Sequence, residues 1–151
     1  MTIAWEPGQE VARLERTMTA ERMRWHCEAL DTAVAAGDRP VAAGVNIHTD
    51  DEVARSSGLR GRVADGMIST NWLSTMLTQT FGDAYLRSGS LRTRYTRPVF
   101  VDDVLRAVVR VADVDEPGGD GDVVLRLDVW CENQDGDICT TGEATVRLPT
   151  S

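Results

Sequence analysis

The sequence predicts an α+β fold in which one buried helix packs against an antiparallel β-sheet. Helical patterns dominate the first half of the chain and strand patterns the second, and this segregation is typical of α+β domains. The segment from about Gly66 to Thr80 has helical spacing, and its interior holds no charged residue. A helix without charges is normally buried on most sides, so we expect it to be the central helix. A chain of 151 residues has room for one core, and we expect a single domain over residues 1–151.

Two further helices are expected before the central one. The first covers about residues 20–35 and is capped by Thr19. Its apolar residues recur at the spacing of a helical stripe: Met23, Cys27, Leu30 and Val34. The second begins where Thr49 forms a capping box with Glu52, and it ends before Gly58.

The chain after Leu91 has the alternation of antiparallel strands. The expected strands are rich in valine, leucine, arginine and threonine, and they cover residues 91–99, 103–114, 122–132 and 137–148. The sequence Asn133–Gly136 is typical of a hairpin turn, and the glycine-rich residues 116–121 form a loop. A weaker pattern in the first residues predicts a short strand or an extended arm.

Charge and cysteine content disfavour several partners and compartments. The net charge of −8 lacks the positive field that nucleic-acid binding requires. Three cysteines without C-x-x-C spacing are typical of a reduced cytosolic protein. The first residues lack the pattern of a signal peptide, and the apolar runs fall short of the ~20 residues that span a bilayer. We therefore expect a soluble cytoplasmic protein with no nucleic-acid or membrane partner.

Motifs for the common cofactors and metals are absent from the sequence. It contains no glycine-rich nucleotide-binding loop, no G-x-S-x-G motif, and no cysteine and histidine cluster with zinc-binding spacing. We therefore expect no cofactor and no metal. Of the two histidines, His26 lies in the amphipathic first helix, which predicts a structural role. His48 remains for chemistry, together with carboxylates, hydroxyls, backbone N–H groups and water.

Residues 44–67 give the strongest functional signal. His48 directly precedes a capped helix, which fixes its backbone, and Asp65–Gly66–Met67 opens the buried helix. A helix N-terminus presents unpaired N–H donors and a partial positive charge, and a glycine there lets a ligand oxygen approach the backbone. An imidazole near such an end suits chemistry on a polarised carbonyl, because the helix end stabilises enolate charge while the base moves a proton.

This segment resembles the MaoC-like, or R-specific enoyl-CoA hydratase, family. The family pattern is N-x-H-x-D-x-x-x-A-x-x-x-G-[FL]-x-x-x-[VI]-A-x-G-M. The residues that match it are Asn46, His48, Asp50, Ala54, Gly58, Leu59, Val63, Ala64, Gly66 and Met67. The likeness extends to residues 14–19, 97–99, 102–105 and 128–136, so it covers nearly the whole chain.

The resemblance implies a hotdog fold, in which an antiparallel sheet wraps a long central helix, and a homodimer. It also implies syn hydration of a trans-2-enoyl thioester, or the reverse dehydration, on an acyl-CoA or acyl-carrier-protein substrate. In the family an aspartate and a histidine hold the reacting water and move protons, and the glycine before the central helix donates its N–H to the thioester carbonyl. By position, His48 is the implied histidine and Gly66 the implied carbonyl donor.

The sequence departs from the family at the aspartate. Counting back from His48 in the family spacing D-x-N-P-x-H, the aspartate position is Ala43. The nearest upstream acid, Asp38, takes this role if residues 39–44 form an insertion, and Asp65 is the other candidate acid. If neither reaches the site, His48 supports a different reaction on an activated thioester, such as isomerisation or intramolecular addition, or the protein only binds the thioester.

The remaining predictions concern substrate binding. The predicted substrate-binding residues are Asn46, Asp65, Met67, Arg92 and Arg94. Asn46 either orients His48 or satisfies a loop carbonyl. A run of arginines has two interpretations, an exposed strand face balanced by neighbouring acids or a site for the phosphates of CoA or of a phosphopantetheine arm. These arginines are Arg87, Arg92, Arg94 and Arg97.

Three functional hypotheses follow from the sequence. The leading one is an enoyl-thioester hydratase or dehydratase with His48 as general acid/base, Asp38 as its partner and the Gly66 N–H as the carbonyl donor. The enzymatic rival is a hotdog thioesterase in which Asp65 activates a water for attack on the carbonyl. The non-catalytic rival is a binding or assembly subunit that keeps the fold without the family aspartate.

Overall fold

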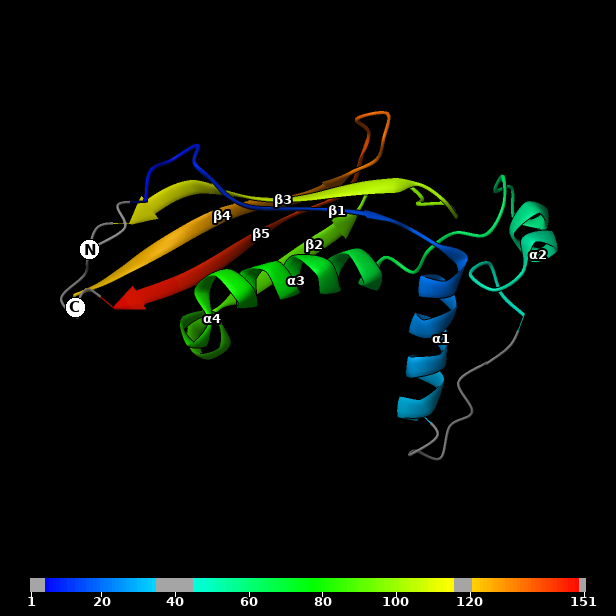
Figure 1. Ribbon diagram of the computed structural model, residues 1–151, viewed down its shortest axis with the longest axis horizontal. Coiled ribbons are helices and arrows are strands. Elements are labelled where there is room, and N and C mark those ends of the chain that lie inside the picture. The colour runs from blue at the N-terminus through cyan, green and yellow to red at the C-terminus, as the bar shows by residue number, and fades with distance from the viewer. Residues whose placement is uncertain (1–4, 35–44, 116–120, 150–151) are drawn as a thin grey trace.

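The computed structural model describes residues 5–34, 45–115 and 121–149 (Figure 1). The helices are α1 (Ala20–Val34), α2 (Asp51–Ser56), α3 (Met67–Phe81) and α4 (Asp83–Ser88). The strands are β1 (Glu10–Thr17), β2 (Ser90–Tyr95), β3 (Val104–Asp115), β4 (Asp122–Glu132) and β5 (Ile138–Pro149). The helices cluster before the last four strands, so the predicted α+β organisation is confirmed.

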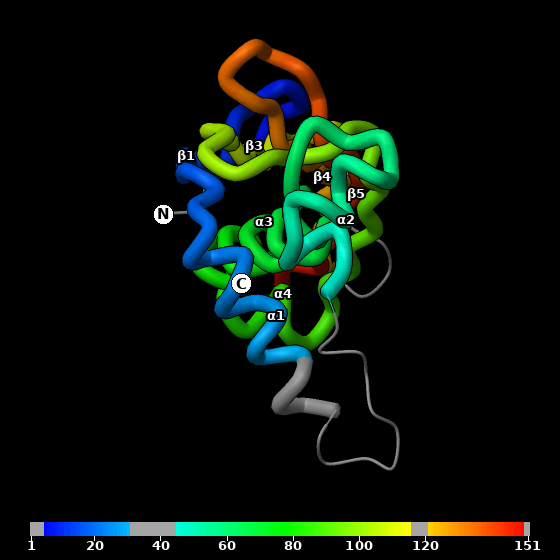
Figure 2. The backbone as a smooth tube through the Cα atoms, turned by 90° about the vertical axis from the view of Figure 1, so that its right-hand side faces the viewer, coloured from blue at the N-terminus to red at the C-terminus, as the bar shows by residue number. Residues whose placement is uncertain are grey.

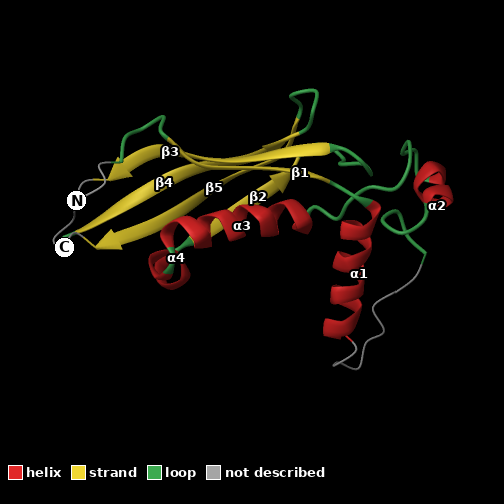
Figure 3. Cartoon of the chain, in the orientation of Figure 1, coloured by secondary structure: helices red, strands yellow, loops and turns green. Residues whose placement is uncertain are grey.

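These strands form one antiparallel sheet in the order β1-β3-β4-β5-β2. The predicted N-terminal strand is β1, which pairs with β3 along its length. The predicted hairpin joins β4 to β5, where the Asn133 side chain accepts the N–H groups of Asp135 and Asp137 at 3.0 and 2.9 Å. Helix α3 lies along one face of the sheet (Figure 3).

The core lies between α3 and the sheet. Leu73 and Leu77 of α3 are fully buried, and Trp72 and Met76 are nearly so. The facing side chains come from β3, β4 and β5 and include Val109, Val111, Leu125, Leu127, Val129 and Val146. Full burial of such side chains contributes roughly 1.5–3 kcal/mol each. The predicted central helix is therefore confirmed, and its uncharged sequence reflects this burial.

Helices α1 and α2 lie beyond the N-terminal end of α3, away from the packed face of the sheet (Figures 1 and 2). Met23 anchors α1 in an apolar cluster with Ile68 and Trp72. Leu30 is 44% exposed and Trp25 is 55% exposed. The predicted helix is confirmed, and the described part of its apolar stripe runs from the buried Met23 to the exposed Leu30.

The start of α2 differs from the predicted capping box. Its N-cap is Asp50, whose carboxylate accepts the N–H groups of Glu52 and Val53 at 2.8 and 2.9 Å. The Thr49 hydroxyl instead accepts the Asn46 N–H at 3.0 Å. One charged oxygen can accept two amides and also complements the helix dipole, so aspartate displaces threonine as the cap.

Two elements around α3 also differ from the predictions. Helix α4 was not predicted, and Gly82 with φ 53° separates it from α3. The strand predicted over 91–99 ends at Tyr95. Beyond it, the Thr96 N–H still donates to the Cys139 carbonyl at 2.9 Å, but Pro98 has no N–H for further pairing.

Candidate active site

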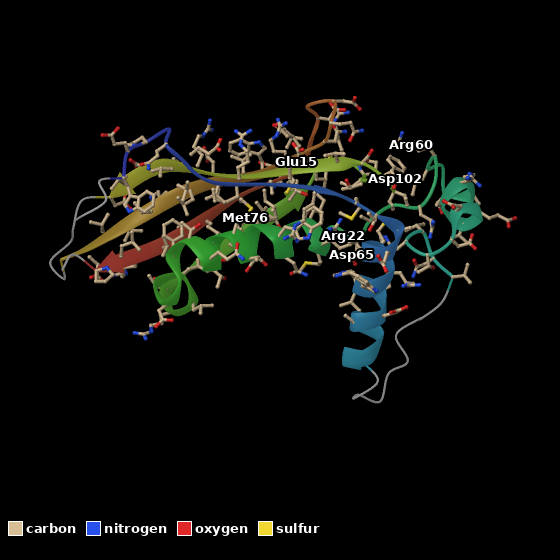
Figure 4. All side chains as sticks on the ribbon, viewed as in Figure 1. Glu15, Arg22, Arg60, Asp65, Met76 and Asp102 are labelled. Atoms are coloured by element: carbon tan, nitrogen blue, oxygen red, sulfur yellow. The ribbon has the colours of Figure 1, made fainter. Side chains whose placement is uncertain are left out.

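A cavity of about 330 Å³ lies at the N-terminal end of α3. Its walls come from the first turn of α3, the chain before that turn, the segment after β2, and β5. Among the lining residues are Met18, Asp65, Gly66, Arg97, Cys139 and Thr140. Figure 4 shows Asp65 between the start of α3 and α1. The cavity therefore lies at the predicted donor end of the buried helix.

Gly66 places a free backbone donor at this cavity. Asp65 occupies the next two donors of the turn, since its carboxylate accepts the Met67 N–H at 2.8 Å and its carbonyl accepts the Ile68 N–H at 3.1 Å. The Gly66 N–H has no acceptor among the described residues. A Cβ at this position would lie 2.7 Å from the Tyr95 ring, so a larger residue would displace the tyrosine. The glycine is required here by space, and its N–H is available to a ligand oxygen.

The His48 ring is fixed by one hydrogen bond at the border of the cavity. Its Nδ1 lies 2.8 Å from the carbonyl oxygen of Val63, which is itself a lining residue. Because a carbonyl only accepts, Nδ1 carries a proton, and in the neutral imidazole Nε2 then has the lone pair. His48 is not among the residues that line the cavity, so the described geometry supplies a base beside the site rather than within its walls.

The backbone of His48 is held by Asn46. The Asn46 side-chain oxygen accepts the His48 N–H at 2.8 Å, and the Asn46 carbonyl accepts the Thr49 and Asp50 N–H groups at 3.1 and 3.0 Å. The turn therefore leads directly into the capped start of α2. Of the two interpretations of Asn46, this geometry favours orientation of His48, and a direct contact with substrate stays a prediction.

Asp65 and Met67 both lie at the start of α3. The second carboxylate oxygen of Asp65 is 3.7 Å from Nε2 of His26. The Met67 sulfur accepts the Tyr95 hydroxyl at 3.3 Å, and that hydroxyl also lies 2.9 Å from the Thr70 hydroxyl. Met67 thus helps to hold the aromatic ring that covers Gly66.

The predicted arginine cluster is divided by the fold. Arg97 lines the cavity and pairs with Asp137 at 3.4 Å. Arg92 and Arg94 alternate along β2 with Thr93 and Tyr95, whose hydroxyls face α3, so both arginines point away from α3. The predicted fourth member, Arg87, pairs with Asp83 within α4. The arrangement brings only Arg97 to the site, and roles for Arg92 and Arg94 in substrate binding stay predictions.

The predicted acid Asp38 and the family position Ala43 lie outside the described residues. Sequence reasoning missed the buried hydroxyls of Ser69 and Thr140, which lie 2.8 Å apart in the cavity wall. Ser69 was visible only as one of several hydroxyl residues in an uncharged helix. Thr140 had no signal, because its approach to α3 depends on strand pairing.

The cavity wall also contains a thiol. Burial raises the pKa of the Cys139 thiol above its ordinary value, and burial raises the pKa of nearby Cys131 to about 12. Both groups therefore remain protonated near neutral pH, and a protonated thiol is a poor nucleophile. The groups suited to proton transfer at this site are thus the imidazoles and carboxylates.

Among residues 5–34, 45–115 and 121–149, no group of three or more histidine, cysteine or acidic side chains is arranged to hold a metal ion. Within the same ranges, no helix combines the length and apolar character that crossing a bilayer requires.

Comparison with known proteins identifies the family. Residues 43–146 match the family model described as a MaoC like domain, which is more than half of the chain. The chain belongs to the MaoC-like dehydratase family. The search of curated proteins finds no match to this chain. Membership in the MaoC-like family supports a hydratase or dehydratase activity in general.

Solved structures of hydratases and a dehydratase share the fold. The (R)-hydratase from A. caviae involved in PHA biosynthesis is 25% identical, with 98% of this chain and 100% of that chain covered and a TM-score of 0.68. The R-hydratase PhaJ1 from Pseudomonas aeruginosa is 22% identical, with coverage of 97% and 83% and a TM-score of 0.68. The HadBC (3R-hydroxyacyl-ACP dehydratase) complex from Mycobacterium tuberculosis is 19% identical, with coverage of 93% and 96% and a TM-score of 0.67. The predicted hotdog fold is confirmed.

Proposed function

We propose that this MaoC-like protein adds water to, or removes water from, the 2,3-position of an acyl thioester. One observation carries the proposal: the Gly66 N–H is without an acceptor in the described chain and lies at a cavity bordered by an imidazole with a free lone pair. A thioester carbonyl needs such a donor, and the carbon chain beside it needs a base.

In this proposal the thioester oxygen accepts the Gly66 N–H. Attack on C3 of an enoyl thioester moves the double-bond electrons toward the carbonyl and forms an enolate. The negative oxygen would lie at the N-terminal end of α3, where the N–H and the helix dipole both stabilise negative charge. A donor at 2.7–3.1 Å from such an oxygen typically contributes a factor of about 100 or more to the rate.

His48 transfers the proton. As the water oxygen bonds to C3, Nε2 takes one of the water protons, and it then delivers a proton to C2 of the enolate. The product gains one hydroxyl and one hydrogen, and the imidazole returns to its starting state. Dehydration is the same sequence in reverse. Asp38 is the proposed partner of His48 from the sequence.

The carrier and the assembly belong to the same proposal. The HadBC relative is described as a 3R-hydroxyacyl-ACP dehydratase, which supports a carrier-protein thioester, and the family resemblance supports a CoA thioester, so both are proposed as substrates here. Arg97 is the arginine at the cavity that suits a phosphate of either carrier. A homodimer is proposed, as the family resemblance implies.

Loss of enoyl absorbance on incubation with crotonyl-CoA tests the reaction. We expect His48→Ala to lower turnover at least ~100-fold, the usual size of general acid/base effects. Glu52→Ala, an exposed change on α2, is the matched control and leaves turnover unchanged. A loss below about threefold in His48→Ala would contradict the role of the imidazole, since a general base contributes about 100-fold or more.

Two other outcomes would replace the proposal. Release of free thiol from the same substrate, measured with a chromogenic disulfide, would identify a thioesterase, for which Asp65 is the cavity carboxylate. Retained acyl-thioester binding with no turnover in either protein would identify a binding subunit. A loss in Asp38→Asn equal to that in His48→Ala would establish Asp38 as the partner acid.

A further inference from the structure

His26 and Asp65 face each other beside the cavity, although the sequence predicts only a structural role for His26. They come from separate elements, α1 and the turn before α3, and His26 Nε2 lies 3.7 Å from Asp65 Oδ2. Asp65 lines the cavity next to Gly66. Figure 4 shows the carboxylate on the side of α3 that faces α1. The fold thus brings the second histidine of the chain to the site.

The Asp65 carboxylate is held on one oxygen and available on the other. Oδ1 accepts the Met67 N–H at 2.8 Å at the start of α3, where negative charge is favourable. Oδ2 has His26 as its neighbour at 3.7 Å. An ionised carboxylate has about four acceptor positions, so Asp65 keeps the capacity to accept a hydrogen bond from a water in the cavity.

The His26 imidazole is incompletely paired. Its side chain is 13% exposed, and Nε2 is a buried atom without a hydrogen bond in the described chain. An unpaired buried polar atom is unfavourable, and such atoms in native proteins call for an explanation. The Asp65 carboxylate lies 3.7 Å from this atom, just beyond hydrogen-bond distance. A shift of a few tenths of an ångström, or one bridging water, closes this gap.

Neighbouring cations are engaged elsewhere. The Arg22 guanidinium on α1 donates to the Thr17 carbonyl at 2.6 Å, and Arg97 across the cavity pairs with Asp137. Within the described residues, His26 is the basic side chain that faces the Asp65 carboxylate within 4 Å. A carboxylate held by an imidazole and a helix end, rather than neutralised by an arginine, retains its ability to bind water.

We propose that Asp65 orients the reacting water and that His26 is its positioning residue; this inference rests on the proposed hydration activity. In the hydration step, the water oxygen bonds to C3 and one water proton passes to His48 Nε2. The other O–H of the same water donates to Asp65, which accepts a hydrogen bond and takes no proton. Asp65 thereby fills the task of the family aspartate whose position here is Ala43.

The test compares kcat and KM for crotonyl-CoA in four variants. Asp65→Asn keeps an oxygen that can cap α3 but loses the charge that orients the water, and we expect kcat to fall about 100-fold because the water is misplaced. His26→Gln should lower kcat about 10-fold to 100-fold at nearly constant KM, because a misplaced catalytic group affects the transition state more than binding. Met23→Ala loosens α1 next to His26 without touching Asp65, so it should lower Tm and leave kcat unchanged. Asp38→Asn, at the partner of His48 proposed from the sequence, is the fourth variant, and the inference expects its loss of kcat to be smaller than that of Asp65→Asn.

The outcomes separate the inference from the proposed function. Normal kcat in Asp65→Asn and His26→Gln with a large loss in His48→Ala would overturn the inference and leave the hydratase proposal standing. An equal loss of kcat in Met23→Ala would show that His26 acts only through the packing of α1, and it would also overturn the inference. A large loss of kcat in Asp38→Asn with little loss in Asp65→Asn would show that Asp38, and not Asp65, orients the reacting water, and it would overturn the inference. Absence of turnover in the wild-type protein would overturn both proposals.

Discussion

The sheet with α3 and the helical region formed by α1 and α2 are built by different forces. Leu73 and Leu77 of α3 are fully buried against β3, β4 and β5. In the helical region, only Met23 and Ala54 are buried among the described side chains of α1 and α2. What orders that region is polar: the Asp50 cap, the Asn46 turn, and the bond from His48 to the Val63 carbonyl.

This difference separates stability from chemistry. The sheet and α3 supply most of the apolar burial in the described chain, and the Gly66 N–H at the start of α3 faces the cavity. His26 lies in α1, and His48 lies in the turn before α2. His48 reaches the cavity border through its hydrogen bond to Val63, and His26 reaches it through its near contact with Asp65. Changes in the sheet and α3 should therefore lower the free energy of unfolding, whereas polar changes in the helical region should lower turnover more than stability.

The largest expected effect on stability is in the core. Leu77→Ala removes a side chain that is fully buried, and we expect the free energy of unfolding to fall by about 2–5 kcal/mol in urea titrations. Leu30→Ala on α1 is the matched control and should change it by less than about 0.5 kcal/mol, because that leucine is 44% exposed. Equal effects at the two sites would show that α1 is packed as tightly as α3.

A smaller effect is expected at the cap of α2. Asp50→Ala removes the acceptor for two backbone amides, so we expect a loss of about 1 kcal/mol in thermal unfolding. Turnover should also fall, because the turn that holds His48 runs directly into this helix. Asp50→Asn keeps an acceptor and should retain both properties. If Asp50→Ala lowered stability but not turnover, the position of His48 would not depend on α2.

The smallest expected effect is on how the stability of the helical region depends on pH. The hydrogen bond from the Arg62 backbone N–H, at 2.9 Å, holds the pKa of the Asp51 carboxyl below its ordinary value of 3.8, with added attraction from the Arg62 guanidinium. Since the folded-state pKa is the lower one, this stabilisation is complete above the unfolded value and is lost as pH falls through the folded value. The Tm difference between wild type and Asp51→Ala should therefore shrink between pH 7 and pH 3.

The same comparison in Leu77→Ala provides the control for the pH experiment. That side chain does not titrate, so the charge of Asp51 cannot contribute to its effect. A Tm difference for Asp51→Ala that grew toward low pH would contradict the assigned sign.

Sequence patterns predicted what depends on local chemistry. The uncharged interior of α3, the turn at Asn133 and the glycine at position 66 each follow from a few neighbouring residues. At α2 the pattern identified the helix but not the cap, since Thr49 and Asp50 are both good N-caps and the competing bond to Asn46 decided between them.

The predictions were weaker where the site depends on contacts across the fold. His26 meets Asp65 only because α1 packs beside the start of α3. Arg97 reaches the cavity, whereas Arg92 and Arg94 do not, because position 97 shares the side of Thr93 and Tyr95, which faces α3, and positions 92 and 94 lie on the opposite side. Strand alternation separates Arg97 from Arg92 and Arg94, but the structure was required to show which side of β2 faces α3.

The central claim is that the acyl group lies between the Gly66 N–H and the His48 imidazole. A crystal structure with a non-reactive acyl-thioester analogue tests it most directly. The account predicts the thioester oxygen within about 3 Å of the Gly66 nitrogen and a water at hydrogen-bond distance from His48 Nε2 near C3 of the acyl chain. An analogue bound outside this cavity, or an imidazole turned into bulk solvent while the analogue is bound, would contradict the account.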